Sequence, residues 1–368
     1  MKILMTNLHE NFQLINKNVK KSFLKLFSSQ KFILGEEVQK LESNLSKINK
    51  VKYTLGVSSG TDAIIVALLA CNIKKNDEVI IPDMTWISTA SSVILLGAKP
   101  IMADVNLEDG TINIDSLEKK ITKKTKAVIS VSLYGHMPNL SKLKSICNKK
   151  RIHLINDGAQ SFGSKHNNKY CHEYTSISCT SFFPAKVLGS YGDAGACFTN
   201  NRSLYERMKV IRAHGQSKKS YSITLGLNAR IDTIQACVLI EKIKFIKKEI
   251  RRRSEILKMY HHKLTTIKQI KVLQPDQSCD ANGSSVVILI NNKKDFQNYM
   301  SSKGVQTANL YNYSITQQPT FKKYQDRKIK NSKLIAKNNV CLPIHPYMKN
   351  KEVDYVIECV KKYFETKN

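Results

Sequence analysis

The chain has 368 residues and is 42% hydrophobic, a composition typical of globular proteins that excludes a wholly disordered chain. Its longest apolar run, residues 63–71, is too short to span a bilayer, and its first residues lack the sustained apolar segment of a signal peptide. We therefore expect a soluble, cytoplasmic protein. The formal net charge of +30 leaves two interpretations open, nucleic-acid binding and attraction of an anionic small substrate.

The distribution of the charge favours the second interpretation. The basic residues are spread over the polar faces of expected helices, and no basic stripe is interleaved with aromatic residues as an RNA platform needs. The nine cysteines include no CxxC pair, and the nine histidines show no HExxH spacing. We expect free thiols in a reducing compartment and no metal site.

The N-terminal part of the chain indicates an α/β unit. Residues 1–50 look helical and charged, with a break near 32–35. A strand at 52–57 then leads through a turn of small residues, including Gly60 and Thr61, into an apolar helix. Free amides and the positive end of the helix dipole can bind an anion there. An ordinary helix cap without a ligand explains the same residues.

Strands and helices continue to alternate through the middle of the chain. Strands are expected at 78–82, 100–104, 127–132, 153–156, 177–183 and 195–199, and helices at 87–96, 139–149 and 201–213. This alternation predicts a mostly parallel sheet with helices on both faces. Ligands of such sheets bind at the C-terminal ends of the strands.

Two side chains follow expected strand ends in this region. Trp86, the single tryptophan, comes just after the strand at 78–82, where its ring can cover a planar ligand or serve as a core or interface aromatic. Asp157 comes directly after the strand at 153–156, where it is either a helix cap or a functional carboxylate.

A sharply turned loop carries Lys186. The strand at 177–183 stops at Pro184, and three glycines follow before the next strand, so the loop cannot continue as a helix. A lysine held between two buried strands is desolvated, and desolvation favours its neutral form over the ammonium. A neutral amine can act as a nucleophile and can accept and return a proton. The alternative is a solvated loop lysine in a lysine-rich chain.

The C-terminal part predicts a second, smaller domain. A polar stretch at 216–222 is expected to be mobile, and a helical pattern runs from 231 to about 264. We place the domain boundary within that helix, which gives a large domain at 1–250 and a small α+β domain at 251–368. The small domain has a strand at 285–290, a helix near 294–303, an irregular stretch at 311–324 and a terminal helix from about 351.

Four of these features together match one cofactor. An anion site, an aromatic plane, a carboxylate and a desolvated lysine are what pyridoxal 5′-phosphate (PLP) needs for its phosphate, ring, pyridine nitrogen and aldehyde. Because all four occur in this order on an α/β scaffold, together they are stronger evidence for a PLP site than any one of them alone.

The chain resembles the fold-type I, PLP-dependent sugar aminotransferases of the DegT/DnrJ/EryC1/StrS group from about residue 5 to its end. The resemblance is carried by SSGTDAI (58–64), DEVIIPDMTW (77–86), VSLYGH (131–136), NDGAQSFG (156–163), SFFPAKVLGSYGDAG (181–195), RAHGQ (212–216), GLNARIDTIQA (226–236) and LPIHPY (342–347). It implies a large PLP-binding domain with a mostly parallel sheet and a smaller α+β domain.

The resemblance also implies roles for single residues. Lys186 would form the Schiff base with the cofactor and move the proton, and Asp157 would pair with the pyridine nitrogen. Gln160 would contact a ring substituent, and Trp86 would stack on the ring. The phosphate would be held by Gly60, Thr61, Ser181 and Asn228.

Asn228 would come from the neighbouring subunit, which implies a homodimer with shared active sites. Arg230 is a candidate fork for a carboxylate or phosphate, or else a structural interface arginine. Some relatives carry histidine at the lysine position and are dehydratases, and Lys186 argues against that chemistry here.

The implied reaction moves the amine of L-glutamate, through the pyridoxamine form, onto a keto sugar linked to a nucleotide diphosphate. One branch acts on a UDP-linked 3-keto uronic acid and usually has an HYPIPL-type stretch. Here that stretch reads LYNYSI (310–315), with leucine for histidine and both prolines lost. We therefore place a UDP- or dTDP-4-keto-6-deoxyglucose first, giving a viosamine-type 4-amino-4,6-dideoxy sugar, with Tyr311 and Tyr313 in the substrate pocket.

Three alternatives stay open at this point. The first is a 3-aminotransferase acting on UDP-2-acetamido-2-deoxy-3-oxo-glucuronate or on a 3-keto-6-deoxy sugar. The second is another PLP chemistry, such as a dehydratase or decarboxylase. The third, suggested by the charge, is a nucleic-acid-binding or regulatory protein built on the same fold.

Overall fold

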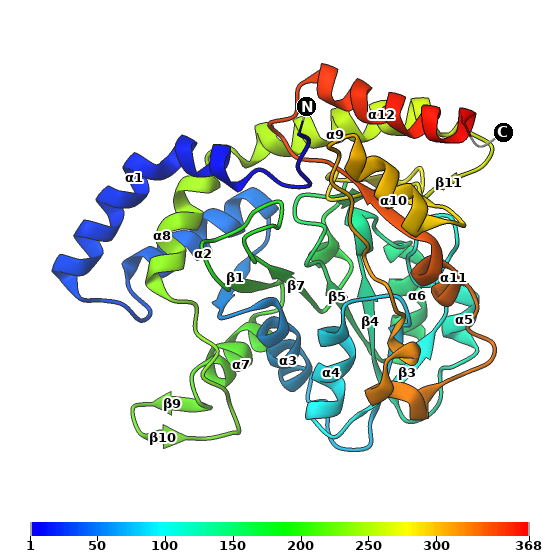
Figure 1. Ribbon diagram of the computed structural model, residues 1–368. Helices are drawn as coiled ribbons and strands as arrows, with labels where there is room; N and C mark the ends of the chain where they lie inside the picture. Colours follow the sequence, from blue (N-terminus) through cyan, green and yellow to red (C-terminus); the bar gives the residue numbers. More distant parts are fainter. Residues whose placement is uncertain (1, 367–368) are drawn as a thin grey trace.

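The computed structural model describes residues 2–366 and has a seven-stranded sheet at its centre (Figure 1). The spatial order is β1-β8-β7-β5-β4-β2-β3, and the strands are β1 (Tyr53–Val57), β2 (Glu78–Pro82), β3 (Lys99–Ala103), β4 (Thr125–Val131), β5 (His153–Asp157), β7 (Ile177–Ser181) and β8 (Gly195–Thr199). The five strands from β7 to β3 are parallel, and β8 is antiparallel to both of its neighbours. The mostly parallel sheet that the sequence predicts is confirmed.

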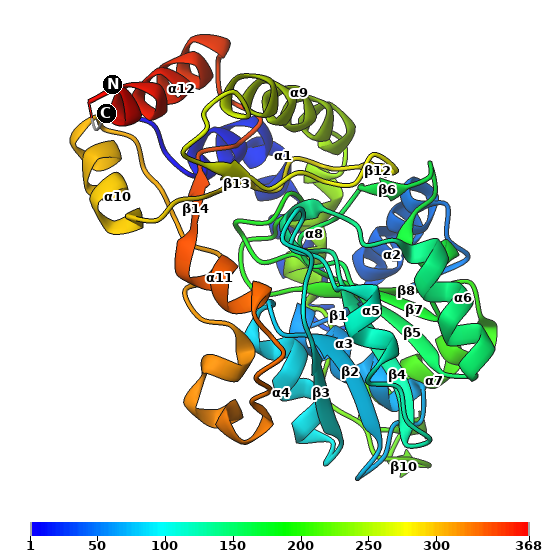
Figure 2. The same cartoon turned by 90° about the vertical axis from the view of Figure 1, so that its right-hand side faces the viewer.

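Helices cover both faces of this sheet, as the two views together show (Figure 2). They are α2 (Glu36–Asn49), α3 (Gly60–Ala70), α4 (Ile87–Leu95), α5 (Ile114–Glu118), α6 (Leu140–Lys150), α7 (Arg202–Arg212) and α8 (Thr233–Lys242), and α1 (Leu8–Ser29) packs on the outer side of α8. Side chains of a strand alternate between the two faces. Val79 and Ile81 accordingly pack in one buried cluster with α3, α4 and α7, whereas Ile80 packs in another with α5 and α6.

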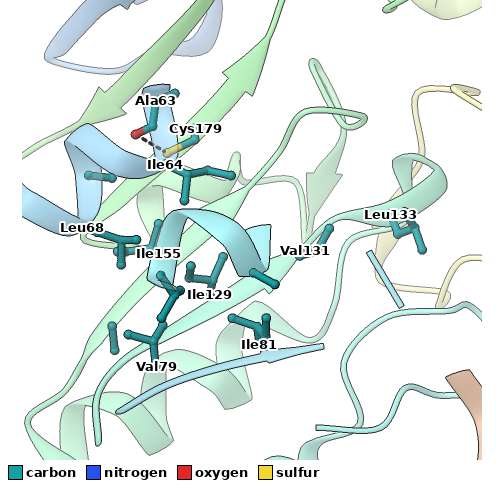
Figure 3. Close-up of a cluster of buried hydrophobic side chains, with 14 of the residues drawn as sticks. Ala63, Ile64, Leu68, Val79, Ile81, Ile129, Val131, Leu133, Ile155 and Cys179 are labelled. Carbon is teal, nitrogen blue, oxygen red and sulfur yellow. Dashed lines mark hydrogen bonds between the residues drawn. The ribbon is translucent and has the colours of Figure 1, made fainter. Parts of the chain in front are cut away.

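The helix α3 lies against the middle of the sheet, where its apolar side chains meet those of β2, β4, β5 and β7, the last through Cys179 (Figure 3). Cys179 Sγ also donates to the Ala63 carbonyl oxygen, at 3.3 Å. Because α3 is apolar nearly all round, its burial fixes the position of its N-terminus at the C-terminal edge of the sheet. All nine cysteines are free, as the sequence predicts.

A second, antiparallel sheet is built from the C-terminal part of the chain. It has the order β11-β13-β14, with β11 (Lys271–Val272), β13 (Val286–Leu289) and β14 (Asn339–Leu342). The helices α9 (Ile246–Leu264), α10 (Lys293–Ser302) and α12 (Asn350–Glu365) pack with it around a separate buried cluster. The segment 310–338, which includes α11 (Asn331–Asn338), instead packs into the cluster of the large sheet through residues such as Ile315 and Phe321. The domain boundary near residue 250 stays a proposal.

One expectation about local structure needs correction. The helical pattern at 231–264 is not one helix, because α8 ends at Lys242 and α9 begins at Ile246. A tight turn between the two helices redirects the chain, and the Phe245 amide closes it by donating to the Lys242 carbonyl oxygen at 3.0 Å. As a result, α8 packs on α1 and α2, whereas α9 packs on α12. The polar stretch at 216–222 forms a hairpin of β9 (Gln216–Lys218) and β10 (Tyr221–Ser222). A short pair of β6 (Lys165–His166) and β12 (Cys279–Asp280) completes the sheets.

None of the helices in residues 2–366 combines the length and the apolar character that a membrane span requires.

Candidate active site

A cavity of about 340 Å³ opens at the C-terminal edge of the parallel strands. The ends of β4, β5 and β7, the start of α3 and one segment of the C-terminal part surround it. Eight of the residues predicted from the sequence line it, namely Gly60, Thr61, Trp86, Asp157, Gln160, Ser181, Lys186 and Tyr311. These residues come from five separate stretches of the chain, so the fold itself brings them together.

Lys186 enters the cavity from a loop that close backbone packing holds. Its own amide donates to the Phe183 carbonyl at 2.9 Å, which closes a turn after β7. At Gly189, a Cβ atom would lie 2.3 Å from the Pro184 carbonyl oxygen, so this tight return requires glycine. Burial lowers the pKa of Lys186, although Asp157 opposes that shift. The side chain is half-buried, because its exposed part faces the cavity.

Asp157 lies on the floor of the cavity at the end of β5. Its Oδ2 accepts from Thr89 Oγ1 at 2.8 Å and its Oδ1 accepts from the Ala159 amide at 3.1 Å. Burial raises its pKa, while these two hydrogen bonds and the charge of Lys186 lower it, and the net direction is upward. Asp157 is therefore a buried carboxylate that a cationic partner in the cavity would stabilise.

The start of α3 offers unpaired donors to the cavity. The first amides of a helix have no partner within the helix, and those of Gly60 and Thr61 lie at the cavity wall. A Cβ on Gly60 would lie 2.7 Å from Ser181 Cβ, so only glycine lets α3 approach the end of β7 this closely. This edge of the cavity can hold a phosphate group.

The opposite wall is made of aromatic and amide side chains. The rings of Trp86 and Tyr311 are 5.1 Å apart between centroids and inclined by 45°. Gln160 Nε2 donates to Tyr311 Oη at 3.0 Å, and Gln160 Oε1 accepts from the Tyr134 amide at 2.7 Å. Tyr134 Oη in turn donates to the Leu310 carbonyl at 2.5 Å. This network fixes Tyr311 over the cavity.

Two carboxylates at neighbouring strand ends fasten the segment that carries Tyr311. The fully buried Asp83, just after β2, accepts from the Thr316 amide at 2.8 Å and the Thr316 hydroxyl at 3.1 Å. Asp104, just after β3, accepts from the amides of Lys330, Asn331 and Ser332 at 2.9–3.0 Å and from the Ser332 hydroxyl at 2.8 Å. The cavity wall is thus tied to the edge of the large sheet.

Sequence reasoning missed Thr89, Tyr134, Asp83 and Asp104. The signals for three of them were present. Asp83 directly follows the expected strand at 78–82, Asp104 ends the expected strand at 100–104, and Thr89 lies three residues after Trp86 at the start of a helix. Tyr134 gave no comparable signal, since the carbonyl that its hydroxyl contacts is 176 residues away in the sequence.

Three residues predicted for the site lie outside this cavity. Asn228 is exposed, and its Oδ1 accepts from Arg230 Nε at 3.0 Å and Arg230 Nη2 at 2.6 Å. Tyr313 is 60% exposed and lines a shallow depression with four lysines beside α11. Asn228 is the residue that the resemblance assigns to the neighbouring subunit's site, and Arg230, the candidate fork for a carboxylate or phosphate, lies beside it.

Comparisons with known proteins agree with one another. The model of the DegT/DnrJ/EryC1/StrS aminotransferase family matches residues 13–361. A UDP-2-acetamido-2-deoxy-3-oxo-D-glucuronate aminotransferase of Pseudomonas aeruginosa is 35% identical over 86% of this chain and 88% of that protein. A pleiotropic regulatory protein of Geobacillus stearothermophilus is 31% identical over 99% of both chains.

A dTDP-3-amino-3,6-dideoxy-alpha-D-galactopyranose transaminase of Aneurinibacillus thermoaerophilus is 32% identical over 94% of this chain and 95% of that protein. Among solved structures, that of DesV from S. venezuelae superposes with a TM-score of 0.95 at 25% identity and covers 98% of both chains.

Proposed function

This chain belongs to the DegT/DnrJ/EryC1/StrS aminotransferase family, and we propose that it transfers the amine of L-glutamate to a keto sugar carried by a nucleotide diphosphate. It is an aminotransferase, and its cofactor is pyridoxal 5′-phosphate. The single observation that supports the proposed chemistry best is the meeting of Lys186 and Asp157 in one cavity, each with its pKa displaced by burial.

The residues of the cavity fit this cofactor. Asp157 is a buried carboxylate without a cation bonded to it, and it would hold the pyridine nitrogen protonated. The free amides at the start of α3 and Ser181 Oγ would hold the phosphate, while Trp86 and Gln160 would contact the ring. When bound, PLP supplies an electron sink for the carbanion that forms at the substrate carbon.

The protein's own side chains would then position the substrate and move a proton. Lys186 Nζ, whose pKa is lowered by burial, would take the proton from the substrate carbon and return it one position further along. Asp157 would stay ionised because the cation beside it offsets the burial that raises its pKa, and the pair is stronger where water is kept from the floor of the cavity. The rings of Trp86 and Tyr311 close that side of the cavity.

For the sugar, we propose an uncharged 6-deoxy keto hexose. No arginine of the same chain lines the cavity among residues 2–366, and Lys186 is its one lysine, so a separate cation for a uronate carboxylate would have to come from the partner subunit. The position of histidine in the uronate branch is taken by Leu310. The 3-amino and 3-oxo sugars named for two of the relatives favour amination at C3, the alternative that sequence reasoning placed behind C4.

We further propose a homodimer in which Asn228 and Arg230 reach the cavity of the partner subunit. Both lie outside the cavity of their own chain, near the hairpin that projects from the body of the molecule (Figure 1). The segment after β9 carries the exposed apolar side chains Tyr221, Ile223 and Leu225, the last 86% exposed. Such a cluster is typical of a surface that a partner covers.

One relative is named a regulatory protein, and that name with the charge of +30 favours a second candidate, a regulatory role of the same fold. The two candidates differ in their need for Lys186. Regulation by nucleic-acid binding would fall steeply with salt and persist in Lys186→Ala, whereas amine transfer would be lost.

The test is to load the protein with PLP, add L-glutamate, and follow formation of 2-oxoglutarate and of amino sugar. UDP- and dTDP-linked 3-keto- and 4-keto-6-deoxyglucose and the UDP-linked 3-keto uronate are compared as acceptors. The proposal predicts that a 6-deoxy sugar reacts with the higher kcat/KM. Turnover of the uronate alone would contradict the proposed substrate class, and no amine transfer to any acceptor would contradict the proposed function.

A further inference from the structure

A broad depression lined by four lysines lies on the C-terminal part of the chain (Figure 2). It is formed by the start of α10, residues 312–317 and α11, and has a volume of about 600 Å³. Small-molecule sites in proteins typically have volumes of roughly 300–1,000 Å³, so the depression has the size of a ligand site. We call it the lysine depression, after Lys293, Lys330, Lys333 and Lys337 in its wall.

The positive charge of the lysine depression is uncompensated. No aspartate or glutamate lines it, and among residues 2–366 none of the four lysines forms an ion pair with a carboxylate. Asp104, which lies nearby, accepts from the backbone amide of Lys330 and not from its ammonium group. Lys330 directly precedes α11, and Lys333 and Lys337 follow at intervals of three and four residues, so the three charges share one face of the helix and repel each other. An anion bound between them would remove that repulsion.

The other side chains of the lysine depression suit a flat ring. Tyr313 is 60% exposed and Leu334 is 42% exposed, and both line the depression beside the lysines. An exposed aromatic ring can stack on a nucleobase of any kind, and lysines bind phosphate groups as point charges. The depression therefore combines the two features that recognise a nucleotide.

The lysine depression and the active-site cavity share one rim. Tyr311 lines the cavity, whereas Asn312 and Tyr313, the next two residues, line the depression. The backbone from Tyr311 to Tyr313 spans about 7 Å at most, so a single width of chain separates the two hollows. Lys293 holds this rim in place, because its Nζ donates to Asn312 Oδ1 and to the Ala336 carbonyl oxygen, each at 3.1 Å.

We propose that the lysine depression binds a nucleoside diphosphate group, with the phosphates among Lys330, Lys333 and Lys337 and the base against Tyr313. Such a group can come from two sources, the nucleotide of the sugar substrate or a free nucleotide. The first source rests on the proposed function, and the second does not. In both cases the nucleotide lies outside the active-site cavity, across the rim that carries Tyr311.

Titration calorimetry of the PLP-loaded protein with UDP and with dTDP tests this site. In the double variant Lys333→Met/Lys337→Met the phosphates lose two cations, and we expect the affinity for either nucleotide to fall on the order of tenfold. The matched control is Lys247→Met/Lys258→Met, which removes two exposed charges of α9 that line neither hollow. The control should bind UDP as the unchanged protein does.

Tyr313→Ser tests the place of the base. It leaves the lysines unchanged, so UDP should bind several-fold more weakly while the affinity for inorganic pyrophosphate stays the same. Equal UDP affinity in Lys333→Met/Lys337→Met and in the control double variant would overturn the inference, and so would unchanged UDP affinity in Tyr313→Ser. Thermal unfolding checks that the variants fold, and if Lys333→Met/Lys337→Met does not, Lys333→Gln/Lys337→Gln provides the same comparison.

A competition titration distinguishes the two sources. The titration with UDP is repeated in the presence of a saturating nucleotide-linked keto sugar, without glutamate, so that no amine is transferred. If the depression holds the nucleotide of the substrate, the sugar nucleotide abolishes UDP binding, and KM for it rises in Lys333→Met/Lys337→Met by about the factor lost in UDP affinity. If the depression holds a free nucleotide, UDP binds as before. A protein that binds UDP through these lysines but transfers no amine to any acceptor would contradict the proposed function and leave the free-nucleotide site standing.

Discussion

The floor and the wall of the active-site cavity are held in different ways. The floor, with Asp157 and Lys186, sits on neighbouring strands of one parallel sheet and on a loop whose glycines allow close backbone packing. The wall, with Tyr311, belongs to an irregular segment that the carboxylates of Asp83 and Asp104 fasten through backbone amides.

This difference separates what the site does from what it accepts. A side chain on a central strand cannot move without disturbing the ladder of hydrogen bonds around it, so the floor suits chemistry that must stay fixed. A segment tied by a few side-chain contacts can change its sequence while the sheet stays the same. The floor should therefore control turnover, and the wall should control substrate affinity and selectivity.

The largest effect should come from the floor. Asp157→Asn keeps an acceptor for the Ala159 amide but removes the charge that would hold the cofactor nitrogen protonated. We expect kcat to fall on the order of 10²–10³-fold, with a much smaller change in KM. Steady-state kinetics check this, with the exposed Asp280→Asn as control. A change confined to KM would show that Asp157 controls substrate affinity, the role expected of the wall, and not turnover.

Asp83→Ala tests the wall. It leaves the Thr316 amide and hydroxyl without their partner in a buried place, which should cost about 2–3 kcal/mol of unfolding free energy. KM for the sugar should rise several-fold while kcat changes little. The matched control is Asp77→Ala, which removes a carboxylate that accepts from the Lys74 amide on the surface. If Asp83→Ala lowered kcat as much as Asp157→Asn, the separation of floor and wall would be wrong.

The second wall carboxylate gives a dependence on pH. Burial raises the pKa of Asp104, but its hydrogen bonds from Lys330, Asn331 and Ser332 outweigh that, and the pKa lies below the ordinary 3.8. The stabilisation is therefore complete above pH 3.8 and is lost as pH falls through the lower, folded-state value. Asp104→Asn should cost about 2 kcal/mol at pH 7, and its difference from the unchanged protein should shrink in denaturant titrations below pH 4. A difference constant with pH would show that the carboxylate charge is not what fastens α11.

The smallest effect should come from the ion pair of Lys120 with Asp326, 2.5 Å long, which ties the outer part of the same segment to the large domain. The side chains are 19% and 30% exposed, so water still screens the pair. Lys120→Met should lower the unfolding free energy by less than about 1 kcal/mol and leave both kinetic constants unchanged. A loss as large as that of Asp83→Ala would show that this contact, and not the strand-end carboxylates, holds the wall.

The sequence predicts the floor well because its signals are local. Asp157 follows its strand directly, and Lys186 follows Pro184 at a strand end, so each is found from a few neighbouring residues. The strands of the large sheet were predicted with small errors at their ends for the same reason, since each is a short apolar run between turn residues.

The wall could not be predicted in this way. The contacts of Asp83 and Asp104 join residues more than 220 positions apart, and the segment 310–332 has no period that would place it on the large sheet. The break between α8 and α9 was missed because no glycine or proline marks it. The position of the break is set instead by the packing of the two helices against different neighbours.

The most direct test of the proposed chemistry compares the absorbance spectra of the PLP-loaded protein and of Lys186→Ala, before and after L-glutamate. The unchanged protein should show the Schiff-base band and lose it as glutamate donates its amine, and a keto sugar should restore it. Lys186→Ala should show no such band, whereas the exposed Lys169→Ala should behave as the unchanged protein. A Schiff-base band that persists in Lys186→Ala, or that does not respond to glutamate in the unchanged protein, would contradict the account.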